Sequence, residues 1–148
     1  MIKTGDNRKS DGRVRVFEGL QKLLRVEPKV RFAYAFGSSV LGTAGPLSDL
    51  DIAVYCDERV DNFDFKAVLT ERLVRALGVE KIDLVVLNKV SAGLGYSVIS
   101  TGILLKESKA RRVEFETSVL KEYLDFAPFR EVQLSAIGEQ IGRGEYFG

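Results

Sequence analysis

The chain has 148 residues, of which 45% are hydrophobic and 29% are charged, and its formal net charge is +1. These values are typical of a single globular domain, and no stretch reaches the roughly 20 apolar residues that a membrane span needs. The near-neutral charge disfavours direct binding to nucleic acid. The polar N-terminus lacks the apolar run of a signal peptide, and a lone cysteine fits a reducing compartment, so we expect a cytoplasmic protein.

The sequence contains no histidine, and Cys56 is its only cysteine. The missing histidine removes the most common general base and every histidine-ligated metal site. Carboxylates are then the only charged groups suited to hold a metal ion. Oxygen ligands of this kind favour a hard ion such as Mg²⁺.

Apolar residues at helical spacing predict a first helix, which begins at a cap (Ser10 or Asp11) and ends before Pro28. A run of β-branched and aromatic residues predicts a strand over 30–36. A loop rich in glycine and serine follows, and a second strand is predicted over 49–55. The apolar residues of the first helix are Val14, Phe17, Leu20 and Leu24.

The clearest helical pattern covers 61–77 and stops at Gly78. A third strand is predicted over 81–87, a short helix within 91–102 and a short edge strand over 103–107. The predicted apolar face of the 61–77 helix consists of Phe65, Val68, Leu69, Leu73 and Ala76.

A long helix is predicted from Ser108 to about Ala127, and its apolar residues cover about half of the helical circumference. This face is wider than one core contact requires. The helix is therefore either buried on two sides within its own domain or docked on a partner as well. The residues concerned are Val113, Phe115, Val119, Leu120, Tyr123, Leu124, Phe126 and Ala127.

The order of these elements predicts an α/β (α+β) fold with a small mixed sheet flanked by helices. No repeat or interdomain linker interrupts the chain. We therefore expect one domain over 1–148, with a core at about 30–107 and a C-terminal helical segment over 108–148.

Asp49 and Asp51 are the most informative pair, because residues two apart in a strand project from the same face. Two carboxylates so placed repel each other unless a cation offsets their charge. Pairing the first two strands would bring Gly37 and Ser38 beside them, where backbone amides and a hydroxyl can hold phosphate oxygens. Asp83 lies near the start of the third strand, and it becomes a third metal ligand or a base if that strand pairs with the second.

These residues resemble the signature of the polymerase-β-type nucleotidyltransferase superfamily: Gly37-Ser38, ten residues, then Asp49-Leu50-Asp51 preceded by Ser48. The resemblance covers residues 30 to 87, includes Asp83 as the third carboxylate, and is greatest for the minimal nucleotidyltransferase (MNT) branch. The segment after residue 100 resembles the C-terminal helix of MNT proteins paired with HEPN toxins.

The resemblance implies a polymerase-β-like fold and transfer of AMP from ATP to a hydroxyl, with release of pyrophosphate. The acceptor would be a tyrosine of a HEPN toxin. The chain would act as an antitoxin that silences this toxin and forms a hetero-oligomer with it. Asp49, Asp51 and Asp83 would be the catalytic and Mg²⁺-binding residues. The residues expected to bind the nucleoside triphosphate are Gly37, Ser38, Ser39 and Ser48.

One position departs from the resemblance: many MNT loops carry a basic residue before the second glycine, where this chain has Leu41. The lost phosphate contact weakens triphosphate binding unless Arg111, Arg112 or a partner replaces it. Two alternatives therefore stay open. One is a non-catalytic antitoxin that neutralises its partner by binding alone, and the other is a nucleotidyltransferase acting on a small molecule such as an aminoglycoside.

Overall fold

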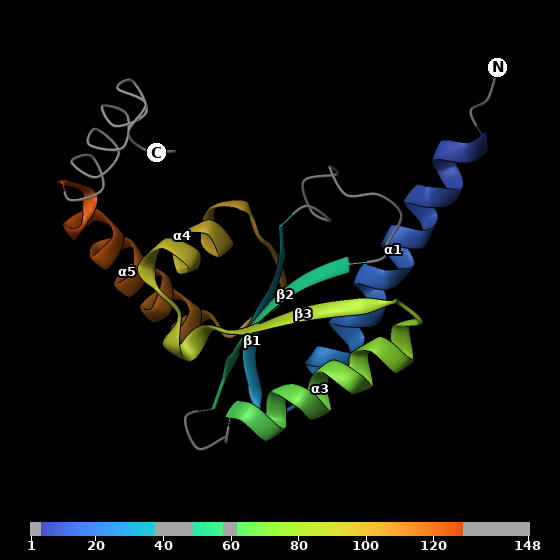
Figure 1. The fold of residues 1–148 in the computed structure, drawn as a ribbon, viewed down its shortest axis with the longest axis horizontal. Helices are drawn as coiled ribbons and strands as arrows, with labels where there is room; N and C mark the ends of the chain where they lie inside the picture. The colour runs from blue at the N-terminus through green and yellow to red at the C-terminus, as the bar shows by residue number, and fades with distance from the viewer. Residues whose placement is uncertain (1–3, 38–48, 58–61, 129–148) are drawn as a thin grey trace, which may run out of the picture.

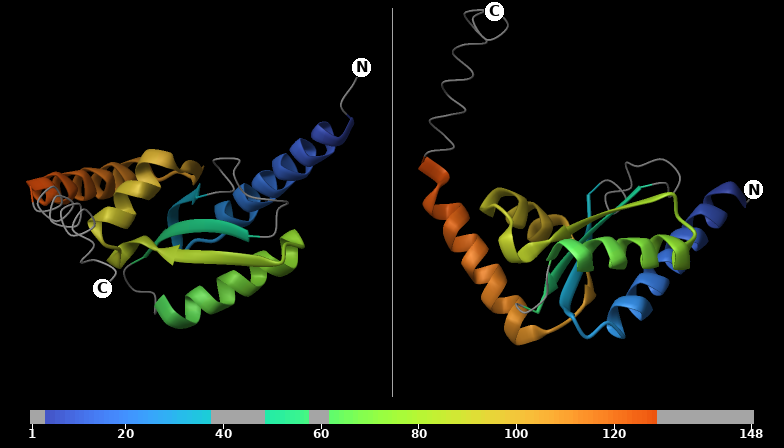
Figure 2. Two further views of the ribbon diagram at one scale, coloured as in Figure 1. Left: turned by 45° about the horizontal axis from the view of Figure 1, so that its top comes forward. Right: turned by 60° about the horizontal axis from the view of Figure 1, so that its bottom comes forward.

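The computed structural model describes residues 4–37, 49–57 and 62–128. A four-stranded mixed sheet lies at its centre, with helices packed on both faces (Figures 1 and 2). This arrangement confirms the fold class expected from the sequence. No helix in the described ranges combines the length and the apolar character needed to cross a membrane.

The strands occur in the sheet in the order β3-β2-β1-β4. β1 pairs antiparallel with both β2 and β4, and β2 pairs parallel with β3. Helix α3 supplies the crossover that a parallel pair requires. The bounds are Val30–Phe36 for β1, Asp49–Cys56 for β2, Lys81–Val86 for β3 and Ile103–Lys106 for β4.

Helix α1 (Thr4–Arg25) covers one face of the sheet, where Leu20 and Leu24 are fully buried. The helix starts earlier than the predicted cap, so Ser10 and Asp11 lie within it. The preceding residues contain no proline. Once the packed part of a helix exists, each further residue adds one hydrogen bond at little entropic cost, so the helix extends beyond its apolar pattern.

Helix α3 (Asn62–Leu77) packs beside α1 on the same face through Leu69 and Leu73. Gly78 follows with a φ of 65°, the left-handed conformation that commonly ends a helix. The predicted core face of α3 was too wide: Val68 and Ala76 are exposed. Only a narrow stripe of side chains meets the sheet from a helix of this kind.

The opposite face carries a 3-10 turn (Leu87–Lys89), helix α4 (Ala92–Thr101) and helix α5 (Lys109–Asp125). Leu87 belongs to this turn, so β3 is one residue shorter than predicted. Figure 2 shows α4 and α5 together on this face of the sheet. The second cluster of buried side chains lies between the sheet and these two helices. Its buried members are Phe32, Tyr34, Phe36, Ala53, Leu87 and Val98, with Phe115 of α5 packed against them.

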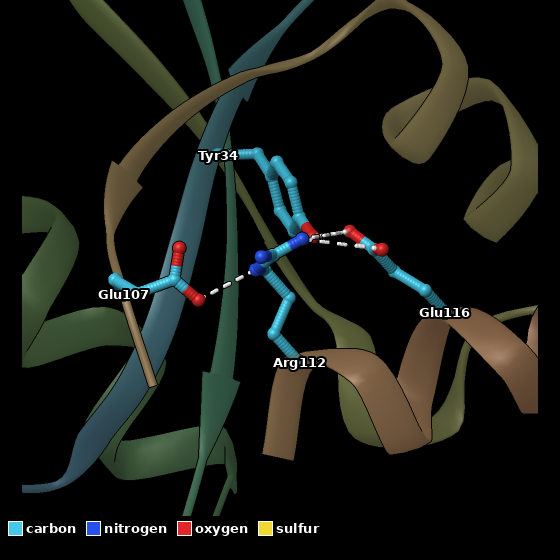
Figure 3. A network of polar contacts seen from close by, with 4 residues as sticks. All are labelled: Tyr34, Glu107, Arg112 and Glu116. Atoms are coloured by element: carbon cyan, nitrogen blue, oxygen red, sulfur yellow. Dashed lines mark hydrogen bonds and ion pairs between the residues drawn. The ribbon is translucent and has the colours of Figure 1, made fainter. Parts of the chain in front are cut away.

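A polar network joins α5 to the sheet (Figure 3). The Tyr34 hydroxyl donates to Glu116 Oε1 at 2.5 Å. Arg112 donates to the same carboxylate and, at 2.6 Å, to Glu107 just after β4. Burial and the neighbouring carboxylate both raise the pKa of Tyr34. The network therefore holds α5 in one orientation on the sheet.

A second apolar stripe of α5 faces away from this core. Val113, Leu120 and Leu124 are seven and eleven residues apart and therefore share one side of the helix. Leu120 is 38% exposed and Leu124 is 66% exposed. Of the two sequence interpretations of this helix, burial on two sides is wrong for the described residues. The stripe leaves a surface suited to a partner.

Candidate active site

Asp51 and Asp83 are direct register partners across the parallel pair β2–β3. Paired residues of neighbouring strands project from the same face of a sheet, so both carboxylates lie on the side that carries α4 and α5. The pairing on which the role of Asp83 depended is therefore present. In the same register, Asp49 is opposite Lys81.

The residues between the aspartates point the other way. Leu50 and Ile52 are buried in the cluster formed with α1 and α3, as are Ile82 and Leu84 on β3. Because side chains alternate along a strand, burying this apolar set forces the intervening residues to the opposite face. The hydrophobic core thus determines the direction of the acidic residues.

Gly37 brings the backbone close to the carboxylate of Asp51. The strand before it ends with Phe36, which is the register partner of Asp51 across β1–β2. Gly37 has a φ of 78°, and a Cβ atom at this position would overlap Asp51 Oδ2. The glycine is therefore required for both its backbone conformation and its close approach. A phosphate-binding turn that begins here would lie beside the carboxylates.

Lys81 is a site residue that sequence reasoning missed. Its Nζ atom lies 3.6 Å from Asp83 Oδ1, and both side chains are more than half exposed. The signal was available in the sequence, because Lys81 precedes Asp83 by two residues in a strand and so shares its face.

The rest of the expected site lies outside the described residues. Ser38, Ser39, Ser48 and the side chain of Asp49 fall in this group, so their roles stay predictions. Among the described side chains, no group of three acidic or cysteine residues is arranged to hold a metal ion.

The donors that are present fit a hard cation. The exposed carboxylate of Asp83 and the half-buried Asp51 offer oxygen atoms only, on one face, beside the backbone of Gly37, which has no side chain. Mg²⁺ is bound by one or two carboxylates and completes its shell with water and substrate phosphates. Asp51 and Asp83, with Asp49, are the residues that would hold it.

The two arginines considered as substitute phosphate contacts lie elsewhere. Arg112 is held by Glu107 and Glu116 in the network of Figure 3. Arg111 lines a hollow of about 250 Å³ next to Tyr55, at the end of β2 opposite Asp49 and Asp51. We call the register pair Asp51 and Asp83 the acidic rung. Neither guanidinium therefore reaches this rung in the structure.

A larger hollow, of about 710 Å³, also lies away from the carboxylates. Its rim carries two ion pairs, Arg31 with Asp57 and Arg72 with Glu27. Arg31 lies near the start of β1 and Asp57 follows β2, so this hollow opens at the far end of the sheet. Within the described parts of the chain, the pair Asp51 and Asp83 beside the backbone of Gly37 is therefore our candidate site, although this hollow lies elsewhere.

Comparison with known proteins agrees with this fold. Residues 18–111 match the family model described as Polymerase beta, Nucleotidyltransferase. No curated protein matches the chain significantly. Among solved structures, a chain of a toxin–antitoxin determined with AMP-PNP is 30% identical, with a TM-score of 0.69 over 82% of this chain and 97% of that chain.

Two further structures show the same similarity. A chain of the complex between a tri-AMPylated Shewanella oneidensis HEPN toxin and an MNT antitoxin is 27% identical, with a TM-score of 0.66 over 84% of this chain and 98% of that chain. A chain of the toxin–antitoxin MntA–HepT is 26% identical, with a TM-score of 0.65 over 84% of this chain and 97% of that chain.

The fold, the acidic rung and the family match define the class of protein: the chain belongs to the polymerase-β-type nucleotidyltransferase family. Within that class, its structural similarity is to the MNT domains of toxin–antitoxin complexes, which confirms the resemblance noted in the sequence.

Proposed function

We propose that this chain is a Mg²⁺-dependent nucleotidyltransferase that transfers AMP from ATP to a tyrosine hydroxyl of a HEPN toxin and thereby acts as an antitoxin. One observation carries the proposal: Asp51 and Asp83 share a rung of the sheet, with the Gly37 turn against Asp51. The AMP-PNP and the AMPylated toxin of the similar structures support the choice of nucleotide and acceptor.

The transfer forms a bond between the acceptor oxygen and the α-phosphorus and breaks the bond from that phosphorus to the β-phosphate, so pyrophosphate leaves. When bound, Mg²⁺ would neutralise the charge of the triphosphate and of the departing pyrophosphate. Asp49, Asp51 and Asp83 would bind it. We assign Asp83 to accept the proton of the hydroxyl, because its side chain is exposed on the outer strand, where an acceptor has access.

The turn that starts at Gly37 is assigned to the phosphates. The backbone of Gly37 passes directly beside the Asp51 carboxylate, so phosphate oxygens bound at Gly37 would lie next to an ion held by that carboxylate. Ser38, Ser39 and Ser48 are proposed as further contacts of the nucleotide. This division leaves β1 to bind the phosphates and β3 to face the acceptor.

The exposed stripe of α5 is proposed as the surface that binds the toxin. Leu120 and Leu124 contact water across a large part of their surface, whereas binding would bury them. Leu124→Lys should leave the unfolding temperature nearly unchanged and weaken the complex in a pull-down. The control Val68→Lys changes another apolar, exposed residue, on α3, which covers the face of the sheet opposite α5. Equal weakening by both variants would contradict the assignment.

The function is tested by the intact mass of the partner that co-purifies with this chain, measured with and without ATP and Mg²⁺. The toxin should gain one or more AMP units with the wild type and none with Asp51→Asn. Asp64→Asn, which alters an exposed acid on α3, is the matched control and should modify the toxin normally.

Each other result points to a different function. A tight partner that gains no mass would favour an antitoxin that acts by contact alone. Absence of any partner would favour a small-molecule acceptor. Normal transfer by Asp51→Asn would refute the metal site. We expect the two proteins to meet in the cytoplasm, a reducing compartment compatible with the free, buried Cys56.

A further inference from the structure

The charge balance of the acidic rung favours a cation from the protein. The rung brings carboxylates together, and the triphosphate that must bind there is itself a polyanion. Mg²⁺ offsets part of this charge, but phosphate sites commonly add an Arg or Lys. Arg112 is held on α5 and Arg111 lies at the far end of β2, so neither supplies this cation in the structure.

Lys81 is positioned to supply it. It is the register partner of Asp49 and lies two residues before Asp83 on the same strand face. Its Nζ atom is 3.6 Å from Asp83 Oδ1, and its side chain is 63% exposed, so it has room to turn toward a ligand. A lysine offers a point charge with three donors on a flexible stem, which suits a phosphate oxygen.

The ion pair with Asp83 does not by itself explain the position of Lys81. Both side chains are more than half exposed, and exposed pairs of this kind contribute little to stability because water screens them. The pair is also longer than a direct hydrogen bond. Asp83 is therefore a partner that Lys81 can leave at small cost when a more strongly charged group arrives.

The strand order indicates which part of the nucleotide Lys81 would meet. Gly37 follows β1 on one side of Asp51, and Lys81 begins β3 on the other side. A nucleotide with its terminal phosphates on the Gly37 turn would extend its α-phosphate toward β3. We propose that Lys81 binds a phosphate oxygen of the nucleotide at the group being transferred. This inference rests on the proposed function, because it assumes a nucleotide on the acidic rung.

The test is calorimetric titration of the intact chain with AMP-PNP in the presence of Mg²⁺, which needs no turnover. Lys81→Met should weaken binding about tenfold, the loss expected for one charge-assisted hydrogen bond. Lys81→Arg keeps the charge and should recover most of the affinity. Lys66→Met, an exposed lysine on α3 at the opposite face, should bind like the wild type.

A second comparison separates direct contact from an effect exerted through Asp83. In an Asp83→Asn background, Lys81→Met should weaken AMP-PNP binding again by about the same factor. If the second substitution has no further effect, Lys81 acts only by holding Asp83, and the inference is refuted. Equal affinity of Lys81→Met and wild type would also refute it.

Measuring AMP transfer and AMP-PNP binding separately distinguishes failure of the proposed function from failure of this inference. A wild-type chain that binds AMP-PNP but transfers no AMP would refute the enzymatic activity, whereas a tenfold loss in Lys81→Met would still support the phosphate contact. A wild-type chain that transfers AMP with a fully competent Lys81→Met would refute only the inference. Failure of the wild type to bind AMP-PNP with Mg²⁺ would refute both.

Discussion

Replacing Gly37 with alanine tests whether the backbone approach to Asp51 builds the site. The substitution acts in two ways. A φ of 78° is strained for any residue with a side chain, at a cost of ~1–2 kcal/mol. The new Cβ would also overlap Asp51 Oδ2 and would lie 3.1 Å from Cγ and 3.3 Å from Cβ of Asp51.

The crowding at Gly37 should add to the strain. Rotation of the carboxylate moves Oδ2 but leaves the Cβ atom of Asp51 in place, because β2 holds it. The strand end or the turn must then shift, and overpacking of this kind costs about 1–3 kcal/mol. We therefore expect Gly37→Ala to lower the free energy of unfolding by roughly 2–5 kcal/mol in urea titrations. It should also impair Mg²⁺-dependent AMP-PNP binding.

Gly78 provides a matched control. Its φ of 65° imposes the same kind of backbone strain, yet no heavy atom lies within 4 Å of a Cβ built there. Gly78→Ala should therefore lose only ~1–2 kcal/mol of stability and bind the nucleotide normally. If folded Gly37→Ala binds AMP-PNP as well as Gly78→Ala does, the close approach of Gly37 to Asp51 plays no part in the site.

Further predictions concern three other parts of the fold. Tyr34→Phe removes the hydrogen bond to α5 and should lower stability by about 1–2 kcal/mol in urea titrations, and an unchanged midpoint would contradict its role in holding that helix. Burial raises the pKa of Cys56 to about 11, so the native thiol should resist iodoacetamide at pH 8 and react once urea unfolds the chain. Because this folded-state pKa exceeds the usual value of 9.0, the thiol contributes stability that is fully present below pH 9 and is lost between pH 9 and about 11. Between these pH values, the urea midpoint of unfolding should therefore fall less in Cys56→Ala than in the wild type. In α4, Gly93→Ala should raise the unfolding temperature, because open space surrounds the added Cβ atom. Gly95→Ala should not raise it, because its Cβ atom would lie 3.1 Å from Val119 on α5. Equal gains in the two variants would show that α4 and α5 are not tightly packed at Gly95.

The local elements were largely predictable from the sequence. The strand over 30–36 was predicted with its observed bounds, and the helix that ends at Gly78 was also predicted. Both rest on signals contained within a few residues: alternation or runs of β-branched and aromatic residues, helical spacing, and a glycine at the stop. The first helix began earlier than predicted because nothing in its polar lead-in stops helix propagation.

The composition of the acidic site was also visible in the sequence, because residue types and spacings define it. Absence of histidine left carboxylates as charged ligands, and the spacing of Asp49 and Asp51 placed them on one strand face. The core then had to receive Leu50 and Ile52, which determines which face the acids occupy. The role of each acid stays a prediction that the experiments above test.

Only the tertiary structure decided which distant segments meet. The parallel pairing of β2 with β3 aligned Asp83 with Asp51. The sequence alone did not establish that these two strands pair. It also brought Lys81 opposite Asp49, while Arg112 was taken up by two glutamates on and near α5. Contacts between strands and helices depend on which apolar faces can be buried together, a global balance that no local pattern contains. The same balance buries one stripe of α5 and leaves the other exposed.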